Sequence, residues 1–156
     1  MKLFDRNATK NKRIAAGVRG ARNLMNTKGA HWMRGKLYSR RLGRDQYCTV
    51  GGLNAAFGIP QQEGSGTTYD RKGAVPKRLS DRDFAVFCLA REIEGKDLSY
   101  FSTAAADGIV EDWNDDEGRV WEDVSKMLKV VARNIQYGRY TMKHDFGISY
   151  SISKRA

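Results

Sequence analysis

The chain has 156 residues, of which 28 are Lys or Arg and 18 are Asp or Glu, so its net charge is +10. This length suits one domain, and a hydrophobic content of 40% allows a buried core, which excludes a largely disordered chain. No stretch combines the length and apolarity of a secretory signal or a membrane span, and we therefore expect a cytoplasmic protein.

The charge is sorted along the chain. Residues 1–50 hold 13 Lys and Arg against 2 acidic residues, whereas residues 80–117 hold 11 acidic residues against 3 basic ones. A dense cationic segment is what phosphate neutralisation requires, so the pattern predicts a surface that meets a polyanion. The alternative is that the basic and acidic segments simply pack side by side.

Residues 9–26 are predicted to form the first helix, because apolar residues recur at spacings of three and four. Asn7 or Thr9 is expected to cap its start, and Gly29 stands where helices commonly end. Such a basic amphipathic helix binds nucleic-acid backbones, membranes or partner grooves, or is a solvated outer face. Its apolar face consists of Ile14, Val18, Ala21 and Met25, and its basic positions are Lys10, Lys12, Arg13, Arg19 and Arg22.

Residues 29–45 interleave arginines with aromatic residues. The segment is either irregular or a hairpin that turns at Gly35. Rings such as Trp32, Tyr38 and Tyr47 stack on unpaired bases, while arginines contact phosphates. Its cationic residues are Arg34, Lys36, Arg40, Arg41 and Arg44.

A short helix is predicted after Cys48, with Thr49 as its cap. Gly51 and Gly52 fit such a helix only if another segment packs very close to its backbone. Residues 61–79 then lack periodicity and exceed the usual length of a loop, so we predict a mobile loop there.

The second half begins with a helix over residues 80–95, capped by Ser80 with Asp83 and carrying Cys88 on its inner face. A further helical piece is expected over residues 99–110.

Residues 120–135 carry the most regular helical pattern, and the three acidic residues at 115–117 are expected to stabilise its N-terminus. From Tyr140 to Ile152 apolar residues alternate strictly, which predicts a strand or a hairpin turning near residues 145–147. Residues 153–156 form a basic tail. The expected fold is a mostly helical α+β single domain, residues 1–156, with a small β-hairpin or strand near the C-terminus.

One catalytic hypothesis rests on Cys48. At a helix start the dipole and the free amides lower a thiol pKa, which favours a nucleophilic thiolate. His144 would serve as the base and Asp115 would orient it. The alternative is that Cys48 is an ordinary buried cysteine of the core.

No metal site or cofactor is predicted. The two Cys and two His are scattered singly along the chain, without the spacing of a zinc site. The acidic residues at 111–117 do not follow the order of a calcium loop, and we interpret them as capping and solvated groups.

Three pieces of the chain resemble a family of unknown function found in phages and actinobacteria. They are Trp32, the run Cys48-Thr49-Val50-Gly51-Gly52, and Trp113-Asn114-Asp115 before a helix. The family's pattern is a Trp, then Cys-x-x-Gly-Ala, then Trp-Asn-Asp, and Gly52 stands at its Ala position. The resemblance implies a small, mostly helical protein in which Trp32, Cys48, Trp113, Asn114 and Asp115 form one structural cluster. It implies no activity.

The sequence thus favours a non-enzymatic basic protein of phage type whose N-terminal third contacts nucleic acid or a nucleoprotein. Two alternatives remain: a protein-binding effector that inhibits a host factor, and a cysteine-dependent hydrolase or transferase. The oligomeric state is open.

Overall fold

The computed structural model describes residues 6–26, 31–41, 43–59 and 79–156, which form helices and short antiparallel sheets. The α+β fold with a C-terminal hairpin is confirmed. The helices are α1 (Arg6–Met25), α2 (Thr49–Ala56), α3 (Asp81–Glu94), α4 (Thr103–Asp115) and α5 (Trp121–Gln136). The strands are β1 (Tyr38–Arg41), β2 (Arg44–Tyr47), β3 (Leu98–Phe101), β4 (Tyr140–Phe146) and β5 (Ser149–Lys154).

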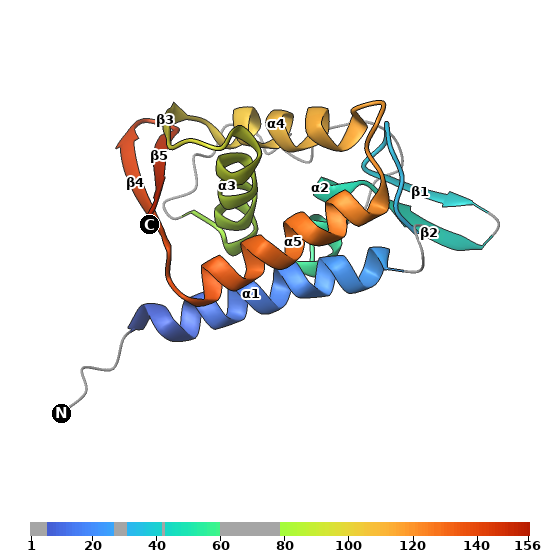
Figure 1. Ribbon diagram of the computed structural model, residues 1–156, viewed down its shortest axis with the longest axis horizontal. Coiled ribbons are helices and arrows are strands. Elements are labelled where there is room, and N and C mark those ends of the chain that lie inside the picture. The colour runs from blue at the N-terminus through green and yellow to red at the C-terminus, as the bar shows by residue number, and fades with distance from the viewer. Residues whose placement is uncertain (1–5, 27–30, 42, 60–78) are drawn as a thin grey trace.

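The first and last helices, α1 and α5, lie side by side and run in opposite directions. In the view of Figure 1, α3 and α4 lie above this pair. The β1–β2 hairpin projects from one end of this helical body, and the sheet of β3, β5 and β4 lies at the other end (Figure 1). The two sheets of the described residues therefore do not contact each other and lie at opposite ends of the helical body.

The core is built from the apolar faces that the periodicity predicted. On α1 the predicted face is completely buried, and α5 contributes a matching stripe. Burying one such aliphatic side chain fully stabilises the fold by about 1.5–3 kcal/mol. Val120 was expected in this stripe but is 49% exposed, because it precedes the first turn of α5 as the N-cap residue. The α1 face is Ile14, Val18, Ala21 and Met25, and the α5 stripe is Val124, Leu128, Val131 and Ile135.

Both predicted N-caps in the first third were wrong. Asn7 and Thr9 lie inside α1, which already begins at Arg6. The cap of α2 is Cys48, whose Sγ accepts a hydrogen bond from the Gly51 N–H at 3.4 Å, and Thr49 is the first helical residue. The Thr49 hydroxyl does not cap α2, because it donates a hydrogen bond to Asn114 Oδ1 on α4.

The hairpin near residue 40 turns later than proposed. Tyr38 pairs with Tyr47 and Arg41 pairs with Arg44, so the chain turns between Arg41 and Arg44. Gly43 has a φ of 73°, a left-handed conformation that favours glycine. Gly35 lies before β1, and its N–H donates to Asp115 Oδ1 at the C-terminal end of α4.

The helix expected over residues 99–110 is partly wrong. Residues up to Phe101 form β3, which pairs with β5, and this pairing across the sequence outweighs the local helical preference. Ser102 then caps α4, its Oγ accepting from the Ala105 N–H at 3.1 Å. The helix continues to Asp115, so the three acidic residues at 115–117 do not precede α5 directly. The acids in the first turn of α5 are Glu122 and Asp123.

The C-terminal hairpin is as predicted, since β4 and β5 pair around Gly147. Of the predicted basic tail at residues 153–156, Ser153 and Lys154 belong to β5, and the Lys154 Nζ forms a 2.8 Å ion pair with Glu92. The loop predicted at residues 61–79 lies outside the described residues, apart from Leu79.

Candidate nucleic-acid interface

The β1–β2 hairpin and the residues just before it carry exposed members of the predicted cationic set. Lys36, Arg40 and Arg44 are exposed, and Arg41 is the partner of Arg44 in the strand register. The acidic residue of the hairpin, Asp45, pairs with Arg40 across the strands. The hairpin thus presents cations beyond the helical body, where a large ligand can reach them (Figure 1).

Two tyrosines stiffen the hairpin on one side. The rings of Tyr38 and Tyr47 lie 5.4 Å apart, and the Tyr38 hydroxyl donates to Asp45 Oδ1 at 2.7 Å. This hydrogen bond to a carboxylate raises the pKa of Tyr38. Tyr47 is buried, so its ring is not open to bases as the sequence suggested, whereas Tyr38 is half-buried.

Residues 31–33 fasten the hairpin along β2. The Tyr47 N–H donates to the His31 carbonyl at 2.7 Å, and the Met33 N–H donates to the Tyr47 carbonyl at 2.9 Å. Trp32 sits between these bonds, half-buried, and its indole N–H points to Asn114. The Trp32 indole N–H therefore has a structural partner within the protein, while its ring is half-buried.

Asn114 joins three segments through one buried side chain. Its Oδ1 accepts from Trp32 Nε1 at 2.8 Å, from the Thr49 N–H at 3.0 Å and from Thr49 Oγ1 at 2.6 Å. Its Nδ2 donates to the Met33 carbonyl at 3.1 Å and to Asp115 Oδ1 at 3.0 Å. Asn114 thus binds the N-terminus of α2 and the base of the hairpin to α4. Neither Asn114 nor Asp115 caps α5, whose N-cap residue is Val120.

Asp115 and Arg34 extend this junction. Asp115 Oδ1 accepts from the Gly35 N–H at 2.8 Å, and the Arg34 guanidinium donates to the carbonyls of Asp116 at 3.2 Å and Glu117 at 2.8 Å. A cation suits the negative C-terminal end of a helix. We call Trp32, Arg34, Thr49, Asn114 and Asp115 the hairpin anchor.

The predicted cluster therefore exists in part. Trp32, Asn114 and Asp115 are bonded together, and Cys48 immediately precedes Thr49. The Trp113 ring instead stacks under the Arg119 guanidinium at 4.2 Å.

The basic residues of α1 serve largely to hold the helices together. The Arg13 guanidinium binds both carboxylate oxygens of Asp81 on α3, at 2.7 and 3.1 Å. Arg19 donates to Gln136 Oε1 at 2.7 Å and Arg22 donates to Ser125 Oγ at 2.8 Å, both on α5. Among these contacts, the Arg13–Asp81 ion pair joins the basic segment to the acidic one, as in the alternative of side-by-side packing, and the other two involve neutral side chains of α5.

The two lysines of α1 differ in their contacts. The Lys10 ammonium lies 5.8 Å from the centre of the Phe84 ring. Lys12 is exposed.

The structure does not assemble the proposed catalytic set. Cys48 is 3% exposed, and burial raises its pKa to about 12, so the expected lowering was wrong. His144 lies on β4, in the sheet at the far end of the molecule from the hairpin (Figure 1). Asp115 bonds to Gly35 and Asn114. Cys88 is fully buried, as predicted.

Sequence reasoning missed a buried polar cluster between α2, α3 and α4. Arg82 is 1% exposed, its Nε donates to Asn54 Oδ1 at 2.7 Å, and it forms ion pairs with Asp83 at 3.1 Å and Asp107 at 2.8 Å. Burial raises the pKa of Asp107 to about 6, although Arg82 opposes the shift. The available signal was Arg82 between Asp81 and Asp83, directly before the apolar run of α3.

Within the described ranges, no helix is long and apolar enough to cross a membrane. No group of three or more His, Cys, Asp or Glu residues in this part of the chain is placed to hold a metal ion. No curated protein and no solved structure matches the chain significantly. Residues 9–134, most of the chain, match the model of DUF6197, a family of unknown function. The protein therefore belongs to this family of unknown function.

Proposed function

We propose that the protein binds nucleic acid through the β1–β2 hairpin. The observation that carries this proposal is the placement of exposed Arg40 and Arg44 on a two-stranded ribbon that projects from the body, with exposed Lys36 just before it (Figure 1). A two-stranded ribbon fits the major groove of duplex DNA, and arginines contact both phosphates and guanine edges.

The hairpin anchor supports the same proposal. A ribbon of two four-residue strands is marginal by itself, so it needs tertiary contacts to keep one orientation. Asn114 and Arg34 supply them from the hairpin's base and leave Arg40 and Arg44 exposed. Holding cations in place lowers the entropic cost of binding a phosphate backbone.

The test is fluorescence anisotropy with a short labelled duplex DNA, and with single-stranded DNA and RNA, at about 50 and 200 mM salt. The informative variant is Arg40→Gln with Arg44→Gln. Its matched control is Lys96→Gln with Lys143→Gln, which removes the same charge from exposed positions at the far end of the molecule.

We expect salt-dependent binding with a log–log slope of about −0.9 per phosphate contacted on duplex DNA. The hairpin variant should lower affinity and flatten this slope by about 2, and the control should change both much less. Absence of binding by the unaltered protein at low salt would overturn the proposal. A stoichiometric partner that survives nuclease treatment of an extract would then favour the protein-binding effector.

A phage origin, an action on a host factor and a cytoplasmic location remain predictions from the sequence. The cysteine-dependent hydrolase loses its physical basis with the raised pKa of the Cys48 thiol.

A further inference from the structure

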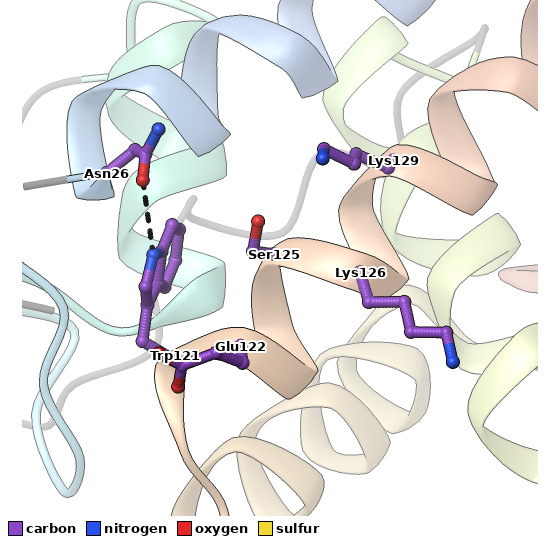
Figure 2. A pocket seen from close by; sticks show the side chains of 6 residues that line it. All are labelled: Asn26, Trp121, Glu122, Ser125, Lys126 and Lys129. Atoms are coloured by element: carbon purple, nitrogen blue, oxygen red, sulfur yellow. Dashed lines mark hydrogen bonds between the residues drawn. The ribbon is translucent and has the colours of Figure 1, made fainter. Parts of the chain in front are cut away.

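A groove of about 480 Å³ lies between the C-terminal end of α1 and the first half of α5 (Figure 2). Its walls are polar and cationic around one buried indole, that of Trp121. The lining residues are Asn26, Trp121, Glu122, Ser125, Lys126 and Lys129.

Two side-chain hydrogen bonds join the C-terminal end of α1 to α5 beside the groove. Trp121 Nε1 donates to Asn26 Oδ1 at 3.2 Å and closes one end. Arg22 Nε donates to Ser125 Oγ at 2.8 Å, which brings a guanidinium to the lining. Figure 2 shows the Lys129 side chain extending across the groove toward α1, while Lys126 points away along the rim.

This arrangement has the chemistry of a phosphate site. Guanidinium and ammonium groups bind phosphate oxygens by charge-assisted hydrogen bonds. The Ser125 hydroxyl accepts from Arg22 and can still donate its own proton to a phosphate oxygen. Among the lining residues, Lys126 and Lys129 are cationic and Glu122 is anionic, and Arg22 adjoins the lining through its bond to Ser125.

The groove also lies at the hairpin's end of the molecule (Figure 1). Arg34, at the base of the hairpin, bonds to the Glu117 carbonyl, four residues before Trp121 at the groove's closed end. The base of the hairpin and the groove are therefore linked through residues 117–121.

We propose that the α1–α5 groove binds the phosphodiester backbone of the same nucleic acid that the hairpin contacts. This inference rests on the proposed function and adds Arg22, Lys126 and Lys129 to its contact surface. The groove reads no sequence, because backbone contacts position a nucleic acid without distinguishing its bases.

The first test compares Lys126→Gln with Lys129→Gln, as a double variant, against the Lys96→Gln and Lys143→Gln control. The groove variant should weaken binding of different duplex sequences equally and reduce the salt slope by about 2. Glu122→Gln should tighten binding at low salt, because it removes the opposing charge. Unchanged affinity and slope in the double variant would overturn the inference.

The second test leaves the protein unaltered. Lysine acetylation, with and without saturating duplex DNA, is read by mass spectrometry. Lys126 and Lys129 should be protected relative to Lys96 and Lys143. If all four lysines are modified equally in a complex whose formation the hairpin variant abolishes, the groove inference is wrong and the hairpin proposal stands. Failure of the unaltered protein to bind would instead remove the proposed function itself.

Discussion

Trp32 donates its indole N–H to Asn114 Oδ1 at 2.8 Å, and this bond ties the base of a projecting hairpin to the end of α4. The same oxygen accepts two further bonds from Thr49. One amide side chain therefore fixes the orientation of the hairpin relative to the helices.

Replacing Asn114 should destabilise the protein and loosen the hairpin. Asn114→Ala leaves the Thr49 and Trp32 donors without their acceptor, at a cost of about 3 kcal/mol. Asn114→Asp keeps an acceptor but places a second carboxylate beside Asp115, so we expect a loss that lessens in acid. Urea unfolding measures both. The exposed Asn23→Ala is the control, and equal midpoints for Asn114→Ala and Asn23→Ala would contradict the role of the anchor.

Gly51→Ala should prevent α2 from packing. A Cβ built at Gly51 would lie 1.7 Å from the Leu37 carbonyl oxygen, a backbone atom of the segment leading into β1. The helix must move away, and the variant should lose several kcal/mol or fail to fold, on the order of the larger core substitutions.

The matched control for this steric argument is Gly20→Ala in α1. There the nearest atom to the added Cβ is the Ala56 Cβ at 3.8 Å, an ordinary contact. A helical Gly→Ala change without a clash stabilises by about 0.5–1 kcal/mol. Thermal unfolding should shift the two variants in opposite directions, and a tolerated Gly51→Ala would refute the close approach.

Stability should fall as pH rises through neutrality because of Glu111. Burial, with added repulsion from Asp107 and Asp115, raises the pKa of Glu111 from 4.5 to about 7. The folded state therefore binds this proton more tightly than the unfolded chain. Its stabilising contribution is complete below about pH 4.5 and is lost as pH rises through about 7.

Glu111→Gln should remove this dependence and be more stable than the unaltered protein at about pH 8. Urea midpoints at about pH 5 and pH 8 measure the effect, with exposed Glu94→Gln as the control. Asp107, whose raised pKa is about 6, contributes a slope of the same sign to every variant that retains it. The same pH slope in both variants would contradict the assignment to Glu111.

Cys48 and Cys88 should both react slowly with iodoacetamide at neutral pH. Burial raises both thiol pKa values, so little thiolate is present and neither sulfur is accessible. In denaturant both should react fast. Rapid, selective modification of native Cys48 would return the cysteine-dependent enzyme to consideration.

The helices followed from periodicity because each buries one apolar face, as with Val18 on α1 and Leu128 on α5. The close backbone approach at Gly51 and Gly52 was also foreseen, since two glycines inside a helix need such a reason. β3 was missed because it exists only by pairing with β5, some fifty residues later in the chain.

The candidate interface was harder to predict than the fold. Composition cannot distinguish Arg13, which forms an ion pair with Asp81, from Arg40 on the projecting hairpin, because that ion pair joins residues 68 positions apart. Asn114 was grouped with Trp32 only through a family resemblance. Its hydrogen bonds join residues 65 and 82 positions apart, which no local pattern encodes.

The pairing of α1 with α5 constrains the order of folding during synthesis. Arg22 and Ser125 are 103 residues apart, and Arg19 and Gln136 are 117 apart. The ribosome therefore releases α1 long before α5 exists, and the part of its apolar face that α5 covers stays exposed until then, although α2 can pack on α1 earlier. Such delayed, non-local closure slows folding and exposes the nascent chain to aggregation. The many cations on α1 repel other nascent copies during that interval.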